Sequence, residues 1–127
     1  MEKTEKILRE LRSREESDLP SKVACDILRA LTILGGSSWE SELSDTLLEL
    51  WHQNQPQAAD LSRSQAEIEG ALETLNDCDV ITSQRRIKAD LSAQAQREEM
   101  LYRALNYSSL ISVFGSDRQV LKYRGRT

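Results

Sequence analysis

The chain has 127 residues, of which 39% are hydrophobic and 30% are charged, and its formal net charge is −4. This length is enough for one domain with a buried core, and the composition is that of a polar globular protein. It excludes a helical membrane protein, because no apolar run approaches the roughly 20 residues that a membrane-spanning helix needs. The N-terminal residues lack the apolar stretch of a signal peptide, so we expect a cytoplasmic protein.

The charges are distributed unevenly along the chain. Residues 1–18 carry five Lys/Arg and six Asp/Glu, which nearly cancel. Residues 19–77 carry three basic against ten acidic side chains, whereas residues 78–127 carry nine against five. An acidic middle followed by a basic C-terminal part is therefore the asymmetry that a functional interpretation has to explain.

Residues 2–16 alternate acidic and basic side chains around three apolar residues, Ile7, Leu8 and Leu11. Opposite charges four residues apart favour a helix here. Because the apolar stripe is short, two interpretations stay open. Either the helix is frayed and solvated, or it is a dimerisation helix that hides the three apolar residues against a partner.

The strongest helical pattern in the chain predicts a first core helix over residues 19–34. Asp18 and Ser21 can cap its start, and Pro20 is tolerated in a first turn. Gly35-Gly36 should end it by adopting a left-handed C-cap. Its apolar residues recur at helical spacing: Val23, Ala24, Ile27, Leu28, Leu31 and Leu34.

A second helix is predicted to open at Ser37 and Glu40, which have the spacing of a capping box. Its inner face comprises Leu43, Leu47, Leu50 and Trp51, and its outer face is acidic, with Glu40, Glu42, Asp45 and Glu49. A phosphate backbone would be repelled by that outer face. Residues 52–60 are then expected to form a polar connector.

The stretch from Leu61 to Lys88 organises the rest of the chain. A third helix is predicted over about 63–76, because apolar residues fall at helical spacing there. Two serines compete to cap it, since Ser62 and Ser64 each have a Gln or Glu three residues further on. The stripe consists of Ile68, Ala71, Leu72 and Leu75.

Two strands should follow this helix and pair antiparallel, at Val80–Ile87 and Met100–Leu105. The polar link between them, residues 88–98, is expected to be mobile or partly helical. Residues 107–127 fit either a hairpin with a loop at Gly115 or a helix that ends there. We favour the helix, because a small three-helix core needs a lid.

No catalytic motif is present, so we expect neither an enzyme nor a cofactor or metal site. Cys25 and Cys78 match no metal or redox spacing and are interpreted as reduced, buried thiols. His52 is the only histidine, and no metal-ligand cluster accompanies it. It is interpreted as a residue at the surface or at a helix end.

The order of three helices, a strand, a basic tip and a second strand resembles the winged helix-turn-helix domain. The likeness covers residues 19–106, with residues 1–18 and 107–127 as additions at either end. It implies a mainly α fold with a small antiparallel β-hairpin, in which three helices form the core and the hairpin forms the wing. One departure is the link from His52 to Leu61, which is longer than the tight turn of the family.

This resemblance implies a transcription regulator that binds double-stranded DNA with its third helix in the major groove and its wing on phosphates. Arg pairs with guanine and Gln with adenine, while basic side chains neutralise phosphates. A helix N-terminus also favours an anion. The implied contacts are Ser62, Arg63, Ser64 and Gln65 at the helix start, and Arg85, Arg86 and Lys88 on the wing, with Arg97 and Arg103 nearby.

Acidic residues oppose this interpretation within the same helix. Beyond its first turn it carries Glu67, Glu69, Glu73 and Asp77, and the sequence pI is about 5.1. The alternative is a winged-helix scaffold that contacts a protein partner and does not bind DNA. A homodimer is a further expectation, because palindromic sites need paired readers.

Overall fold

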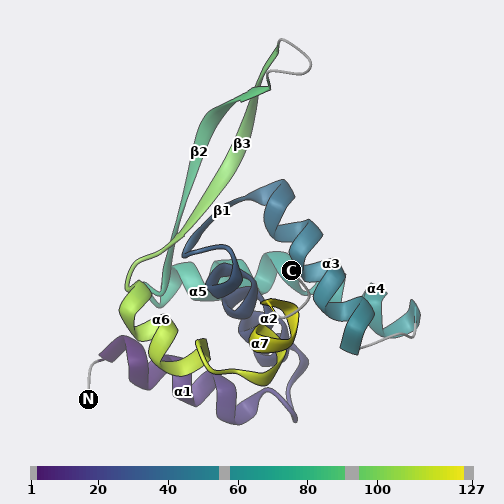
Figure 1. Cartoon of the computed structure of the whole chain (residues 1–127), viewed down its shortest axis with the longest axis vertical. Coiled ribbons are helices and arrows are strands. Elements are labelled where there is room, and N and C mark those ends of the chain that lie inside the picture. Colours follow the sequence, from purple (N-terminus) through teal and green to yellow (C-terminus); the bar gives the residue numbers. More distant parts are fainter. Residues whose placement is uncertain (1–2, 55–57, 91–94, 125–127) are drawn as a thin grey trace.

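The computed structural model of the chain describes residues 3–54, 58–90 and 95–124. These residues form a mainly helical fold with a small three-stranded antiparallel sheet (Figure 1). No helix among them is both long and apolar enough to span a bilayer. The elements in chain order are α1 (Lys3–Arg14), α2 (Leu19–Ile33), β1 (Ser37–Trp39), α3 (Glu40–Asn54), α4 (Ala58–Ala66), α5 (Ile68–Asp77), β2 (Ile81–Asp90), β3 (Ala95–Ala104), α6 (Tyr107–Phe114) and α7 (Arg118–Arg124).

Helix α2 lies at the centre of the core, and its bounds confirm the helix predicted at 19–34. It packs against α1, α3, α5, α6 and α7. The predicted glycine cap is also confirmed, because Gly35 and Gly36 have φ of +85° and +99°. The Gly36 N–H donates to the Leu31 carbonyl at 2.7 Å, which closes the helix. Gly36 also meets the Tyr107 ring so closely that a Cβ there would lie 2.7 Å from its Cδ1.

The sheet has the order β1-β3-β2, and β2 and β3 form a long hairpin that projects from the helical body (Figure 1). This confirms the two predicted strands and their antiparallel pairing. The expectation for residues 88–98 was wrong, because residues 88–90 and 95–98 continue the two strands. Residues 91–94 lie outside the described part of the chain. The pairing of β2 with β3 thus extends well beyond the three residues of β1.

The capping box predicted at Ser37 and Glu40 was wrong. Ser37 lies in β1 opposite Arg103, and α3 begins at Glu40. The start of α3 is capped from the hairpin instead, since the Ser41 N–H donates to Oε1 of Glu99 at 2.7 Å. A carboxylate is favourable at a helix N-terminus because it satisfies a free N–H and faces the positive end of the helix dipole.

The third predicted helix is divided in two at Glu67. Helix α4 ends with the Glu67 N–H donating to the Ser64 carbonyl, and α5 begins with the Ala71 N–H donating to the Glu67 carbonyl. The polar connector expected at residues 52–60 was also wrong, since α3 continues to Asn54 and α4 starts at Ala58. Residues 55–57 lie outside the described residues. His52 is exposed, as expected.

Helix α1 belongs to the core, which corrects the expectation of a frayed, solvated helix. Leu8 is 0% exposed and Leu11 is 7% exposed, because α1 packs against α2 and α6. These two leucines are covered within the chain and not by a partner. The C-terminal residues are helical, and α6 ends just before Gly115 as expected. Cys25 is buried but Cys78 is exposed, so the expectation of a buried thiol was wrong for Cys78.

A buried charge network centred on Arg29 joins the flanking helices to α2. The Arg29 side chain is 3% exposed, and its three nitrogens reach three carboxylates. The distances are 2.7 Å from Nη2 to Glu15 Oε2, 2.8 Å from Nη1 to Asp26 Oδ1 and 3.0 Å from Nε to Asp117 Oδ2. Burial alone would lower the pKa of Arg29, but the Glu15 hydrogen bond and the charges of Asp26 and Asp117 raise it, so the group stays cationic.

The carboxylates of this network have further partners. Asp26 Oδ2 accepts from Trp51 Nε1 and from Lys22 Nζ, both at 2.8 Å. Arg12 donates to Asp117 Oδ2 at 3.1 Å and to the Val113 carbonyl at 2.8 Å. The network therefore links α1, α2, α3 and the start of α7. Buried charges are tolerated when each one has hydrogen-bond and ion-pair partners, as these do.

We expect Arg29→Ala to lower the free energy of unfolding by about 3–5 kcal/mol, because buried carboxylates lose their cation. Urea denaturation of both proteins measures this difference. Arg9→Ala is the matched control, since Arg9 pairs with Glu5 at the surface and should cost less than about 1 kcal/mol. Equal losses for the two variants would contradict the role given to the network.

Candidate nucleic-acid interface

The two faces of the β2–β3 hairpin differ in charge. Residues directly opposite each other in an antiparallel pair share a face, and faces alternate along each strand. The register pairs Thr82 with Arg103, Arg86 with Glu99 and Lys88 with Arg97, all on one face. We call the positions Arg86, Lys88, Arg97 and Arg103 the basic face of the hairpin.

Two members of the basic face, Arg86 and Arg103, have exposed side chains. Lys88 and Arg97 are placed on this face by strand register, and their side chains lie outside what the structure describes. Glu99 shares the register of this face, but its carboxylate is used to cap α3 at Ser41. The Glu99 carboxylate is therefore directed toward the positive end of the α3 dipole.

The other hairpin face is mixed in charge. Arg85 is exposed, and its Nε lies 3.9 Å from Glu98 Oε1, also at the surface. An exposed pair of this kind contributes little to stability and leaves Arg85 available to another anion. Ile87, on the same face by register, is 67% exposed.

The base of the hairpin is fixed to the helical body on two sides. Asn76 Nδ2, near the end of α5, donates to Ser83 Oγ at 2.7 Å. The Glu99 contact with Ser41 attaches the neighbouring strand to α3. Tyr102, 5% exposed, directs its hydroxyl toward Glu40 Oε2 at 3.4 Å. The body therefore sets the direction in which the hairpin projects.

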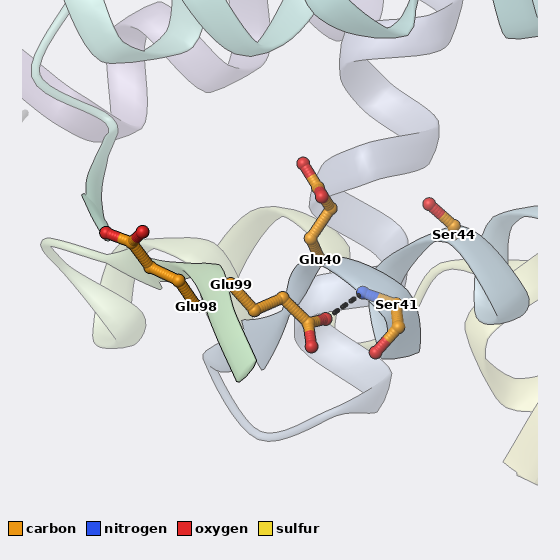
Figure 2. A pocket seen from close by; sticks show the side chains of 5 residues that line it. All are labelled: Glu40, Ser41, Ser44, Glu98 and Glu99. Carbon is orange, nitrogen blue, oxygen red and sulfur yellow. Dashed lines mark hydrogen bonds between the residues drawn. The ribbon is translucent and has the colours of Figure 1, made fainter. Parts of the chain in front are cut away.

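A shallow acidic pocket lies where the hairpin meets α3. Figure 2 shows three carboxylates around it, from Glu40 at the start of α3 and from Glu98 and Glu99 on β3. Ser41 and Ser44 complete the lining. Within the described ranges, no group of three or more His, Cys, Asp or Glu side chains is arranged to hold a metal ion. A phosphate would be repelled from this side of the hairpin base.

The residues expected to begin the reading helix lie elsewhere. Ser62, Arg63, Ser64 and Gln65 belong to the second half of α4, so their N–H groups are inside a helix and not free at its start. Ser62, Arg63 and Gln65 are exposed, but Ser64 is 1% exposed and cannot touch DNA, which corrects that prediction. The proposed use of a helix N-terminus at these residues was therefore wrong.

The structure does not bring Arg63 together with Arg85 and Arg86. Helix α4 joins the start of α5, and the hairpin leaves from the end of α5 (Figure 1). Ten helical residues span about 15 Å, which separates the two attachment points. Helix α5 itself contains no Lys or Arg, and Glu69, Glu73 and Asp77 are exposed on it.

Glu99 and Asn76 are functional candidates that the sequence interpretation missed, because both act by positioning the hairpin. Glu99 and Ser41 are 58 residues apart, so no local spacing signals their contact. Side chains alternate between the two faces of a strand, so a known register would have placed Arg86 and Arg103 on the same face of the hairpin.

Comparison of the sequence with protein-family models, with curated proteins and with solved structures gives no match. Its function therefore has to be inferred from the geometry of this chain. Its strongest feature is a rigidly based hairpin that carries a basic face away from an otherwise acidic body.

Tyr102 makes the hairpin base sensitive to alkaline pH. Burial, followed by the charge of Glu40, raises the pKa of Tyr102 to about 12 from the usual value of about 10. The folded state then retains the proton between pH 10 and 12 while the unfolded state loses it. The stabilisation is therefore complete below pH 10 and is lost as pH rises through 12.

We expect the free energy of unfolding to fall more steeply between pH 10 and 12 for the wild-type chain than for Tyr102→Phe. Urea denaturation at several pH values in this window tests the difference. Other titrating groups are common to both proteins, so only the difference in slope is informative. Identical slopes would show that Tyr102 does not favour the protonated state of the fold.

Proposed function

We propose that this chain is a winged-helix protein that binds double-stranded DNA mainly through the basic face of its hairpin. The order of α2, α3 and the α4–α5 pair, followed by β2 and β3, supports a helical core with a wing. Strand β1 supports it too, because it pairs with β3 and completes a small sheet at the hairpin base.

The observation that carries the proposal is the exposure of arginines on a projecting arm. Arg85, Arg86 and Arg103 are exposed on the hairpin, and Lys88 and Arg97 extend the positive charge by register. Basic side chains bind DNA by neutralising phosphates and releasing counterions, a contribution that is independent of sequence. Lys88 and Arg97 lie further along the strands than the contact of Glu99 with α3, whereas Arg103 lies at the hairpin base opposite Ser37.

The same geometry implies weak sequence preference. Contacts with phosphates position a protein on DNA, whereas base contacts specify the sequence. Helix α5 offers no basic side chain to a major groove. Arg63 lies on α4 and not beside the basic residues of the hairpin. A role in transcription regulation would then draw its site selection from another component or from DNA shape.

Binding of a labelled 30-base-pair duplex, followed by fluorescence anisotropy at several salt concentrations, tests the proposal. We expect affinity to fall steeply with salt and to be similar for unrelated sequences. The double variant Arg86→Ala/Arg103→Ala should bind more weakly and reduce the slope of log K against log salt by about 1.8, or about 0.9 for each lost phosphate contact.

Arg63→Ala is the matched control, because it removes an exposed arginine of α4 and should change neither the affinity nor the slope. Failure of the wild-type chain to bind duplex DNA at low salt would overturn the proposal. A loss caused by Arg63→Ala, but not by the hairpin variant, would place the DNA contact on α4.

A second candidate, a scaffold for a basic protein partner, is favoured by the acidic side of the molecule. Glu40, Glu42, Asp45 and Glu49 are exposed along α3. Such a face repels DNA but complements a Lys- or Arg-rich surface, which supports specific association with a protein.

Affinity purification with the tagged chain distinguishes this candidate. If the scaffold function holds, Glu42→Lys/Asp45→Lys should release a partner that the wild type retains, while Arg86→Ala/Arg103→Ala should keep it. In the opposite pattern, the bound material would be lost only in the hairpin variant and after nuclease treatment of the wild type. That result would exclude the scaffold function and support DNA binding.

A further inference from the structure

The positive charge of the hairpin is concentrated on β2, the strand at the edge of the sheet. In the order β1-β3-β2, β2 has β3 as its one neighbour within the described sheet. From Ile81 to Lys88, β2 carries three basic residues and no acidic one. Over residues 97–103 of β3, two basic residues accompany Glu98 and Glu99. A polyanion therefore meets more net positive charge on the edge strand than on the inner strand.

The cations of β2 lie on both faces of the ribbon. Successive residues of a strand alternate between faces, so Arg85 lies on one face and Arg86 on the other, which Lys88 shares by register. Both arginines are exposed, and the 3.9 Å contact of Arg85 with Glu98 is a weak surface pair. If either face docked flat on DNA, the arginine of the other face would point away from it.

The acidic pocket borders β3, on the side where α3 holds the ribbon. Its carboxylates come from Glu40, Glu98 and Glu99, and Glu99 is bonded to α3 (Figure 2). Helix α5 reaches β2 at the base of the hairpin, through the bond from Asn76 to Ser83. Beyond this base, β2 projects from the body together with β3 (Figure 1). The outer edge of β2 is therefore the side of the ribbon by which an anion can approach.

We propose that β2 enters the major groove of duplex DNA edge-on, so that the two phosphate backbones flank opposite faces of the ribbon. This inference rests on the proposed DNA binding and adds the orientation of the hairpin and the groove that it enters. In this orientation Arg85 faces one backbone, while Arg86 faces the other. Both arginines then neutralise phosphates, which flat docking does not allow.

The thickness of the ribbon decides which groove admits it. Sheets that pack face to face lie about 10 Å apart, a distance that measures one sheet with its side chains. The major groove is about 12 Å wide and the minor groove about 6 Å, so the ribbon fits the major groove without deforming the duplex. An edge strand also directs backbone N–H and C=O groups outward, here toward the edges of the bases.

Ile87 supplies a contact with a base in this orientation. It lies on the same face as Arg85 and is 67% exposed, so burial does not explain an isoleucine at this position. The methyl group of thymine is an apolar feature that the major groove presents and the minor groove does not. Contact with Ile87 therefore gives a modest preference for thymine, in addition to the phosphate contacts that dominate affinity.

Fluorescence anisotropy with a labelled duplex tests the edge-on orientation. Arg85→Ala and Arg86→Ala should each weaken binding and each reduce the salt slope by about 0.9. Because Arg85→Ala also leaves Glu98 without its partner, the change is repeated in a Glu98→Gln background, which lacks that charge. Arg63→Ala is again the matched control. Circular dichroism checks that each variant is folded.

The outcomes separate the orientation from the proposed function. A loss of affinity in Arg86→Ala but not in Arg85→Ala, in either background, would overturn edge-on binding and leave DNA binding intact. Failure of the wild-type chain to bind duplex DNA at low salt would overturn both.

Modified duplexes of one sequence test the choice of groove. Uracil in place of thymine removes a methyl group from the major groove, whereas hypoxanthine in place of guanine removes an amino group from the minor groove. We expect uracil to weaken binding about fourfold, as for one lost methyl contact, and hypoxanthine to have no effect. Ile87→Ser should bind the thymine and uracil duplexes equally. Leu121→Ser, which changes an exposed leucine of α7, should still distinguish them. A wild-type chain that responds to hypoxanthine, or that does not distinguish uracil from thymine, would overturn entry into the major groove.

Discussion

The buried guanidinium of Arg29 is the interaction on which the arrangement of the helices depends. It binds the carboxylates of Glu15 just after α1, of Asp26 in α2 and of Asp117 just before α7. Trp51 of α3 also donates to Asp26. Removing a cation and several anions from water costs free energy, and only a fully bonded arrangement offsets that cost. The network therefore favours a packing in which α1 and α7 are held against α2, and α6 packs against both α1 and α2.

That packing determines which surfaces remain for function. Helices α1 and α6 pack on one side of α2, and helices α3 and α5 pack on its other sides. The hairpin is then the part of the described chain that extends away from the core (Figure 1). Its base is held by Glu99 and Asn76, so the position of the basic face follows from the body.

Local signals were sufficient for much of the fold. Helix α2, its glycine cap and the strands of the hairpin follow from periodicity, backbone preference and β-branched residues near each other in sequence. Contacts between distant residues explain the errors. Ser37 has the spacing of a helix cap, yet pairing with Arg103 makes it a strand residue. Leu8 and Leu11 alone form too short an apolar stripe to predict a packed helix. They are buried because α1 packs against α2 and α6, which are distant in sequence.

The candidate site was predictable in its hairpin and not in its helix. Arg85 and Arg86 are exposed as expected, whereas the break at Glu67 moves Arg63 and its neighbours onto a separate helix. Hydrogen–deuterium exchange of the full chain, with and without duplex DNA, tests whether the hairpin is the part of the chain that binds DNA. We expect slower exchange in β2 and β3 when DNA is added, with exchange in α4 and α5 unchanged. Slower exchange in α4 or α5, with the hairpin unchanged, would contradict it.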